Sequence, residues 1–121
     1  MTTILVVDDD LGVCQIVAEY LTDSGYAVLQ ASGCEDALAT LALHPETALL
    51  LTDVRMPGCD GPYLAQSAVT QFPTLLVMLM TGYAVNGWPW PCLHKPFRMA
   101  ALGEKVRLAL DQSSSPVRPA A

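Results

Sequence analysis

Several common features are missing from this sequence of 121 residues. Six lysines and arginines stand against twelve acidic residues, and the basic residues form no run. This balance argues against nucleic acid as the main partner, because phosphate-binding surfaces need clustered lysine and arginine. The longest apolar run, LLVMLM (75–80), is far short of the roughly 20 residues that cross a bilayer. No basic region followed by a long apolar core stands at the start of the sequence, so we expect no secretory signal. We therefore expect a cytoplasmic protein with no membrane partner.

The cysteines form no recognisable pattern. There are four of them, at Cys14, Cys34, Cys59 and Cys92, with no C-x-x-C pair and no adjacent histidine cluster. Neither a zinc site nor a disulfide framework is indicated by this spacing. We expect free thiols in a reducing compartment.

Short apolar runs alternate with helical patterns along nearly the whole chain. The runs expected to be strands are 4–7, 26–31, 48–52, 75–80 and 92–94. The first helix carries an apolar face of Val13, Ile16, Val17, Tyr20 and Leu21, with Asp10 and Gly25 at its ends. Further helices are expected around 37–41, from Pro62 to Phe72, and over about 98–111.

Strands that are apolar without alternation, joined by helices, predict an α/β fold with a parallel sheet covered on both faces. One domain over 1–112 and a disordered tail over 113–121 are expected.

The carboxyl ends of these strands carry polar residues. In strand order they are Asp8 and Asp9, then Asp53, Thr81 and Lys95. Functional residues gather at this edge of an open parallel sheet. Adjacent carboxylates repel one another unless a cation joins them, and oxygen ligands without cysteine or histidine favour Mg²⁺. Each residue alone also fits an ordinary strand end, turn or helix cap, and it is their coincidence that predicts a site.

The chain resembles the receiver domain of two-component response regulators. The motifs that carry the resemblance are VVDDD (6–10), LLTDVRMPGCDG (50–61), MTGYA (80–84) and KPF (95–97). The similarity covers about residues 3–112 and implies a flavodoxin-like fold, a doubly wound five-stranded parallel sheet.

The resemblance also implies roles for the matched residues. Asp53 would be the phosphoacceptor. Asp8, Asp9 and the backbone carbonyl of Arg55 would bind Mg²⁺ together with Asp53.

In the same pattern, Thr81 would donate a hydrogen bond to the phosphoryl group and Lys95 would pair with it. The peptide bond between Lys95 and Pro96 would be cis. These residue types suit the chemistry, because positive charge offsets the repulsion between a carboxylate and a phosphoryl group.

The segment between Thr81 and Lys95 departs from the family pattern. Gly87, Pro89 and Pro91 disfavour the helix that receivers usually have before the fifth strand, so we expect it to be absent or reduced to a turn within 82–91. Cys92 stands where many receivers have a tyrosine or phenylalanine that switches with the threonine. The Trp-Pro-Trp-Pro stretch (88–91) is either a cover over the core, which we favour, or a mobile element.

The resemblance implies a phosphoacceptor in a phosphorelay, and we expect the receiver to be stand-alone. A sensor histidine kinase or a histidine phosphotransfer protein would donate the phosphoryl group, and a downstream protein target would receive the signal by contact. We expect no enzyme activity beyond Mg²⁺-dependent self-phosphorylation and self-dephosphorylation.

The alternatives to this function are an unphosphorylated pseudo-receiver, a receiver fragment of a hybrid histidine kinase, and a small phosphatase-like enzyme. The phosphatase is disfavoured because no second acid stands two residues after Asp53.

Overall fold

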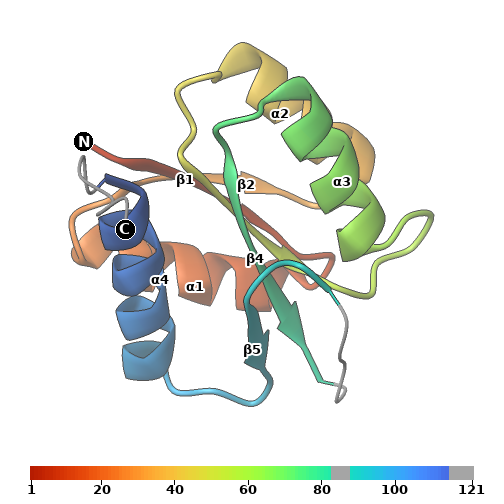
Figure 1. The fold of residues 1–121 in the computed structure, drawn as a ribbon. Coiled ribbons are helices and arrows are strands. Elements are labelled where there is room, and N and C mark those ends of the chain that lie inside the picture. The colour runs from red at the N-terminus through yellow and green to blue at the C-terminus, as the bar shows by residue number, and fades with distance from the viewer. Residues whose placement is uncertain (83–87, 115–121) are drawn as a thin grey trace.

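A computed structural model describes residues 1–82 and 88–114 as an α/β fold (Figure 1). The elements are β1 (Thr3–Val7), α1 (Leu11–Asp23), β2 (Ala27–Ala31), α2 (Cys34–Leu43), β3 (Leu49–Asp53), α3 (Gly61–Gln71), β4 (Leu76–Thr81), β5 (Cys92–His94) and α4 (Met99–Ser114). The strands form one sheet in the order β2-β1-β3-β4-β5, and every neighbouring pair is parallel. This confirms the predicted doubly wound, five-stranded parallel sheet, whose order belongs to the flavodoxin-like class.

Helices cover both faces of the sheet (Figure 1). Ile4 and Val6 of β1 belong to a core cluster with residues of α1 and α4. Leu5 and Val7 belong to a second cluster with residues of α2 and α3. Successive strand side chains point to opposite faces, so a strand covered on both sides must be apolar at every position. This is why the inner strands β1, β3 and β4 show no alternation in the sequence.

The predicted helix ends are largely confirmed. The Asp10 side chain accepts hydrogen bonds from the backbone N–H groups of Gly12 and Val13, at 3.0 and 3.2 Å. After α1 the chain turns at Gly25, whose φ of +105° favours glycine. Pro62 lies in the first turn of α3, two residues after the N-cap residue Asp60. The last helix extends to Ser114, beyond the predicted end at 111 and into the segment expected to be a tail, and residues 115–121 lie outside the described residues.

The expected loss of a helix concerns residues 82–91, between β4 and β5. Residues 83–87 of this span lie outside the described residues, and neither Gly82 nor residues 88–91 are helical. The fourth helix of the described chain, α4, follows β5. Trp88 and Trp90 are half-buried and pack against the core cluster on the α2 and α3 side of the sheet. Their packing favours the interpretation of this stretch as a cover over the core.

Candidate functional site

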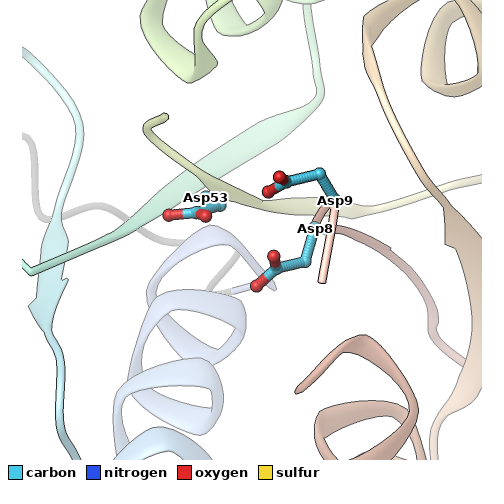
Figure 2. Close-up of side chains that lie close together, drawn as sticks. All are labelled: Asp8, Asp9 and Asp53. Carbon is cyan, nitrogen blue, oxygen red and sulfur yellow. The ribbon is translucent and has the colours of Figure 1, made fainter. Parts of the chain in front are cut away.

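Three carboxylates meet at the carboxyl ends of β1 and β3. Val7 pairs with Thr52 in the sheet, so the next residue of each strand, Asp8 and Asp53, lies at the same edge. One carboxylate oxygen of each of Asp8, Asp9 and Asp53 lies within 4.8 Å of the others. Figure 2 shows the three side chains close together at the ends of the two strands. The structure thus brings the predicted acidic residues together.

Lys95, which follows the edge strand β5, reaches this cluster. Its Nζ lies 3.3 Å from Oδ2 of Asp8 and 3.4 Å from Oδ1 of Asp53. The side chains of Asp8, Asp53 and Lys95 are 1%, 14% and 28% exposed, so solvent screens these ion pairs less than it screens surface pairs. The ammonium group thus pairs with two of the three carboxylates of the cluster.

Thr81 is held beside Lys95 by the sheet. It is the last residue of β4, is buried, and its carbonyl oxygen accepts a hydrogen bond of 2.6 Å from the Lys95 backbone N–H. The peptide bond from Lys95 to Pro96 is cis, as predicted. Arg55 lies exposed in the loop after β3. The metal-binding role of its carbonyl and the phosphoryl-binding role of the Thr81 hydroxyl stay predictions.

Burial makes the ionised form of Asp8 costly. The pKa of Asp8 is raised, mainly by its removal from water and in part by the negative charge of Asp53. The backbone N–H of Asp10, which donates to Oδ1 of Asp8 at 2.9 Å, and the Lys95 ammonium oppose this rise. A buried carboxylate whose negative charge is only partly balanced by its neighbours is stabilised in its ionised form by a further positive charge.

The loop from Val54 to Gly61 fixes the backbone beside Asp53. The N–H of Val54 donates to the Met80 carbonyl oxygen at 3.0 Å and to Oδ1 of Asp53 at 2.9 Å. The N–H of Gly61 donates to the Val54 carbonyl oxygen at 2.7 Å, which closes the loop. A Cβ at Gly61 would collide with the Asp53 carbonyl oxygen. Position 61 therefore needs glycine for this close approach.

An apolar pocket adjoins the acidic cluster on the α1 side. It has a volume of about 390 Å³ and is lined by Val13, Ile16, Val17, Lys95, Pro96, Phe97 and Met99. The sequence pattern places Ile16 on the buried face of α1, but its side chain is 56% exposed. The buried residues of α1 are Cys14, Val17, Ala18 and Leu21, so the covered face is rotated from the predicted one.

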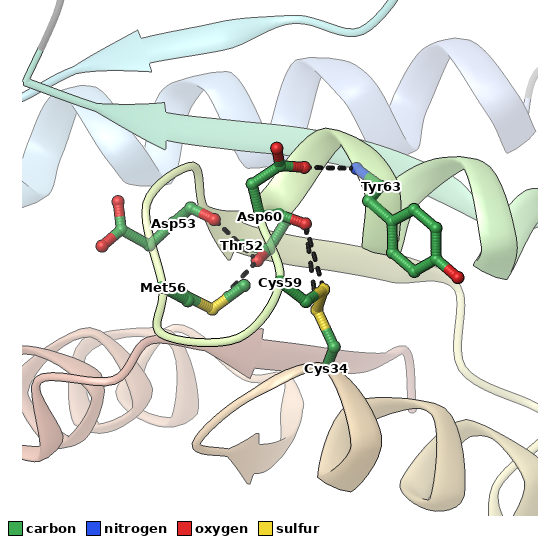
Figure 3. Close-up of a disulfide and its surroundings, with 7 residues drawn as sticks. All are labelled: Cys34, Thr52, Asp53, Met56, Cys59, Asp60 and Tyr63. Carbon is green, nitrogen blue, oxygen red and sulfur yellow. Dashed lines mark hydrogen bonds between the residues drawn. A yellow bond between two sulfur atoms is a disulfide. The ribbon is translucent and has the colours of Figure 1, made fainter.

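The expectation of four free thiols is wrong. Cys34, the first residue of α2, forms a disulfide with Cys59 in the loop after β3 (Figure 3). Their Cα atoms are 6.2 Å apart, within the usual range for such a bond. The two cysteines are 25 residues apart, and only the packing of α2 beside this loop brings them together. Cys14 and Cys92 are free.

Comparisons with known proteins agree with this architecture. The family model of the response regulator receiver domain matches residues 4–87. The C4-dicarboxylate transport transcriptional regulatory protein DctD of Pseudomonas aeruginosa is 32% identical over 120 residues, which cover 91% of this chain and 25% of DctD. The response regulator receiver protein CpdR of Brucella abortus is 36% identical over 84 residues, 69% of each chain. The crystal structure of the receiver domain from the hybrid histidine kinase CckA is 36% identical, with a TM-score of 0.81 over 89% of this chain and 98% of that one.

The chain belongs to the response regulator receiver domain family. Membership places it among the phosphoacceptor domains of two-component signalling. It spans about a quarter of the length of curated relatives such as DctD. Within residues 1–82 and 88–114, no helix is both long and apolar enough to cross a membrane.

The acidic cluster fits the magnesium ion that receiver domains bind. The donors are carboxylate oxygens, which suit a hard cation. Lys95 pairs with two of the three carboxylates, and Asp8 is buried with a raised pKa. A divalent cation would offset negative charge of these carboxylates.

Proposed function

We propose that Asp53 of this chain accepts a phosphoryl group from a phosphohistidine. One observation carries the proposal: the Asp53 carboxylate lies within 4.8 Å of two further carboxylates and 3.4 Å from the Lys95 ammonium, in a chain of the receiver family. The donor would be a sensor histidine kinase or a histidine phosphotransfer protein.

The side chains of Asp8, Asp9 and Asp53 would hold Mg²⁺, together with the backbone carbonyl of Arg55. When bound, the ion would supply positive charge to the phosphoryl oxygens. Asp8 is positioned for this role by the Asp10 N–H, which donates to one of its oxygens and leaves the other toward Lys95.

The transfer needs a nucleophile, a stabiliser of negative charge and a path for the bond electrons. An oxygen of Asp53 attacks phosphorus and forms a new O–P bond, while the P–N bond of the phosphohistidine breaks and its electron pair stays on the imidazole nitrogen. Lys95 offers its ammonium group to the phosphoryl oxygens, and the Thr81 hydroxyl donates a hydrogen bond to one of them. Positive charge and donors fixed in advance stabilise such a transition state without reorganisation.

The apolar pocket between α1 and the segment after β5 would bind the donor. Ile16 exposes an apolar side chain on its wall, and Lys95 links the pocket to the acidic cluster. A helix that carries the phosphohistidine on one face and apolar residues beside it would suit this surface.

The output of this domain is also part of the proposal. Phosphorylated protein would act by contact with a downstream protein target and would not turn over an external substrate, so the chain would not be an enzyme in the ordinary sense. We place this activity in the cytoplasm. The expectation that nucleic acid is not a partner of this chain stays a prediction, because relatives that it matches are named as transcriptional regulators.

Intact mass spectrometry tests the proposal directly. The protein would be incubated with acetyl phosphate and Mg²⁺, as wild type and as Asp53→Asn. Asp23→Asn, a change of an exposed carboxylate at the end of α1, serves as a matched control. We expect one phosphoryl adduct on wild type and on the control, no adduct on Asp53→Asn, and none after EDTA.

A folded wild type that binds Mg²⁺ and forms no adduct, either with acetyl phosphate or with a phosphorylated donor protein, would overturn the proposal. The chain would then be a pseudo-receiver, which interacts with partners without being phosphorylated.

A further inference from the structure

The disulfide joins α2 to the loop that begins at the proposed phosphoacceptor. Cys59 lies six residues after Asp53 and four after Arg55. Figure 3 shows Cys34 at the start of α2 bonded to Cys59, with Asp53 at the other end of the same loop. The bond therefore connects a separate helix to the segment that carries the predicted carbonyl ligand.

The base of this loop is held by hydrogen bonds, and its tip is held by the disulfide. Val54 and Gly61 pair across the base at 2.7 Å, and Val54 is tied to β4 through the Met80 carbonyl. Pro57 and Gly58 form the exposed tip, with Gly58 at a φ of +82°. Cys59 follows them directly, so its covalent bond limits how far the tip moves from α2.

The disulfide borders a pocket at the protein surface. Cys34 and Cys59 are half-buried and line a surface pocket of about 440 Å³. The other residues of its lining are Ser32, Gly33, Glu35, Asp36, Pro57 and Gly58. The free thiols differ: Cys14 is buried, and burial raises the pKa values of both Cys14 and Cys92, which lowers their thiolate content and reactivity.

We propose that the Cys34–Cys59 disulfide is a thiol-sensitive clamp on the Mg²⁺ and phosphoryl site. The inference rests on the proposed function, because it acts through the Arg55 carbonyl as a ligand. Opening the clamp frees the loop tip, and metal binding must then order it again. The oxidised protein should therefore bind Mg²⁺ more tightly and be phosphorylated faster than the reduced protein.

The chemistry is thiol–disulfide exchange with a small thiol. A thiolate attacks one sulfur of the pair, the S–S bond breaks, and the other cysteine leaves as a thiolate. A second small thiolate attacks the mixed disulfide and is released as the oxidised small-molecule disulfide. Two electrons pass to the protein, and two protons from solvent convert Cys34 and Cys59 to thiols.

The test compares Mg²⁺ binding to the wild type in its two redox states. Air-oxidised protein and protein reduced with dithiothreitol, then desalted without oxygen, would each be titrated with Mg²⁺ by calorimetry. Alkylation and intact mass would count the free thiols, and we expect two in the oxidised and four in the reduced form. We expect Mg²⁺ affinity to be roughly three- to tenfold lower after reduction.

Two variants distinguish the effect of breaking the disulfide from any other effect of the reductant. Cys34→Ser/Cys59→Ser should have the affinity of reduced wild type under both conditions. Cys92→Ser, which removes a half-buried free thiol, should respond to reduction as wild type does. Circular dichroism would check that both variants fold, and the wild-type comparison stands whether or not they do.

Equal Mg²⁺ affinity in the oxidised and reduced wild type would overturn the clamp and leave the proposed function intact. Four alkylated thiols in the air-oxidised protein would overturn it as well. Failure of both forms to bind Mg²⁺ would overturn the proposed function together with the clamp.

Discussion

The two flanks of the acidic cluster are built differently. On the α1 side, an apolar pocket reaches from Ile16 to Lys95 and is held by side-chain packing. On the α2 side, the loop that contains Arg55 is closed by backbone hydrogen bonds and by the Cys34–Cys59 disulfide. The first flank offers contact area to a protein, and the second sets the position of backbone groups beside Asp53. We infer that donor recognition and site geometry are handled by separate parts of the fold.

Loss of Lys95 should have the largest effect, since this residue lines the apolar pocket and also pairs with Asp53, the proposed phosphoacceptor. Lys95→Ala removes the ammonium group 3.4 Å from Asp53, and we expect phosphorylation by acetyl phosphate to slow by about 10²-fold. Mg²⁺ affinity should not fall, because the three carboxylates remain. The rate of adduct formation measures the effect. Lys105→Ala is the control, since the Nζ of Lys105 donates to the carbonyl oxygen of Cys92, and this variant should react like wild type. An equal loss of phosphorylation rate in both variants would contradict the role assigned to Lys95.

Ile16→Asp should break the apolar flank alone. It places a charge in the proposed docking surface, and we expect transfer from a phosphorylated donor protein to slow by roughly tenfold, about 1.4 kcal/mol. Phosphorylation by acetyl phosphate, which needs no docking surface, should be unchanged. Leu43→Asp is the matched control, since Leu43 is an exposed leucine at the end of α2. Equal slowing with both phosphodonors would show that Ile16 acts on the site and not on docking.

Gly61→Ala should disturb the other flank. Its Cβ would collide with the Asp53 carbonyl oxygen and lie 3.0 Å from the Cα of Val54. We expect a loss of about 1–3 kcal/mol in the free energy of unfolding and weaker Mg²⁺ binding. Chemical denaturation and calorimetry would measure the two effects. Gly33→Ala, where a Cβ meets open space, should cost less than about 0.5 kcal/mol. Similar losses at both positions would refute the close-approach argument.

We expect the smallest effect in the pH dependence of stability. It arises from Asp8, which belongs to the acidic cluster between the two flanks. In metal-free protein the raised pKa of Asp8 means that the folded state holds this proton more tightly than the unfolded state. The resulting stability is present below the unfolded pKa and is lost as pH rises through the folded pKa. Asp8→Asn stays neutral throughout, so its advantage in unfolding free energy over wild type should grow as pH rises above the ordinary aspartate pKa of 3.8.

Thermal melts without Mg²⁺, with Asp23→Asn as an exposed control, would measure this trend. A difference that shrinks as pH rises would show that ionised Asp8 is stabilised by its surroundings.

The sequence predicts the sheet and its acidic edge because both rest on local patterns. Apolar runs mark the strands, and the edge follows from the residue types that come directly after them. Asp8 and Asp53 could be placed together from the sequence alone, because strands in a parallel sheet all present their carboxyl ends at one edge.

The differences between the flanks were less predictable. The periodicity of α1 indicates an apolar stripe, yet it does not say which edge of the stripe the sheet and α4 cover, and Ile16 lies on the uncovered edge. The pairing of Cys34 with Cys59 depends on the packing of α2 against the loop after β3. No local spacing encodes such a contact.

Direct location of the phosphoryl group tests the central claim most sharply. Wild type phosphorylated with acetyl phosphate and Mg²⁺ would be reduced with borohydride, which converts an acyl phosphate to an alcohol, and then digested with trypsin. Arg55 is the first lysine or arginine of the chain, so Asp8, Asp9 and Asp53 share one peptide and fragmentation tells them apart. We predict modification at residue 53 alone, dependent on Mg²⁺. Modification at Asp8 or Asp9, or none on folded protein, would contradict the account.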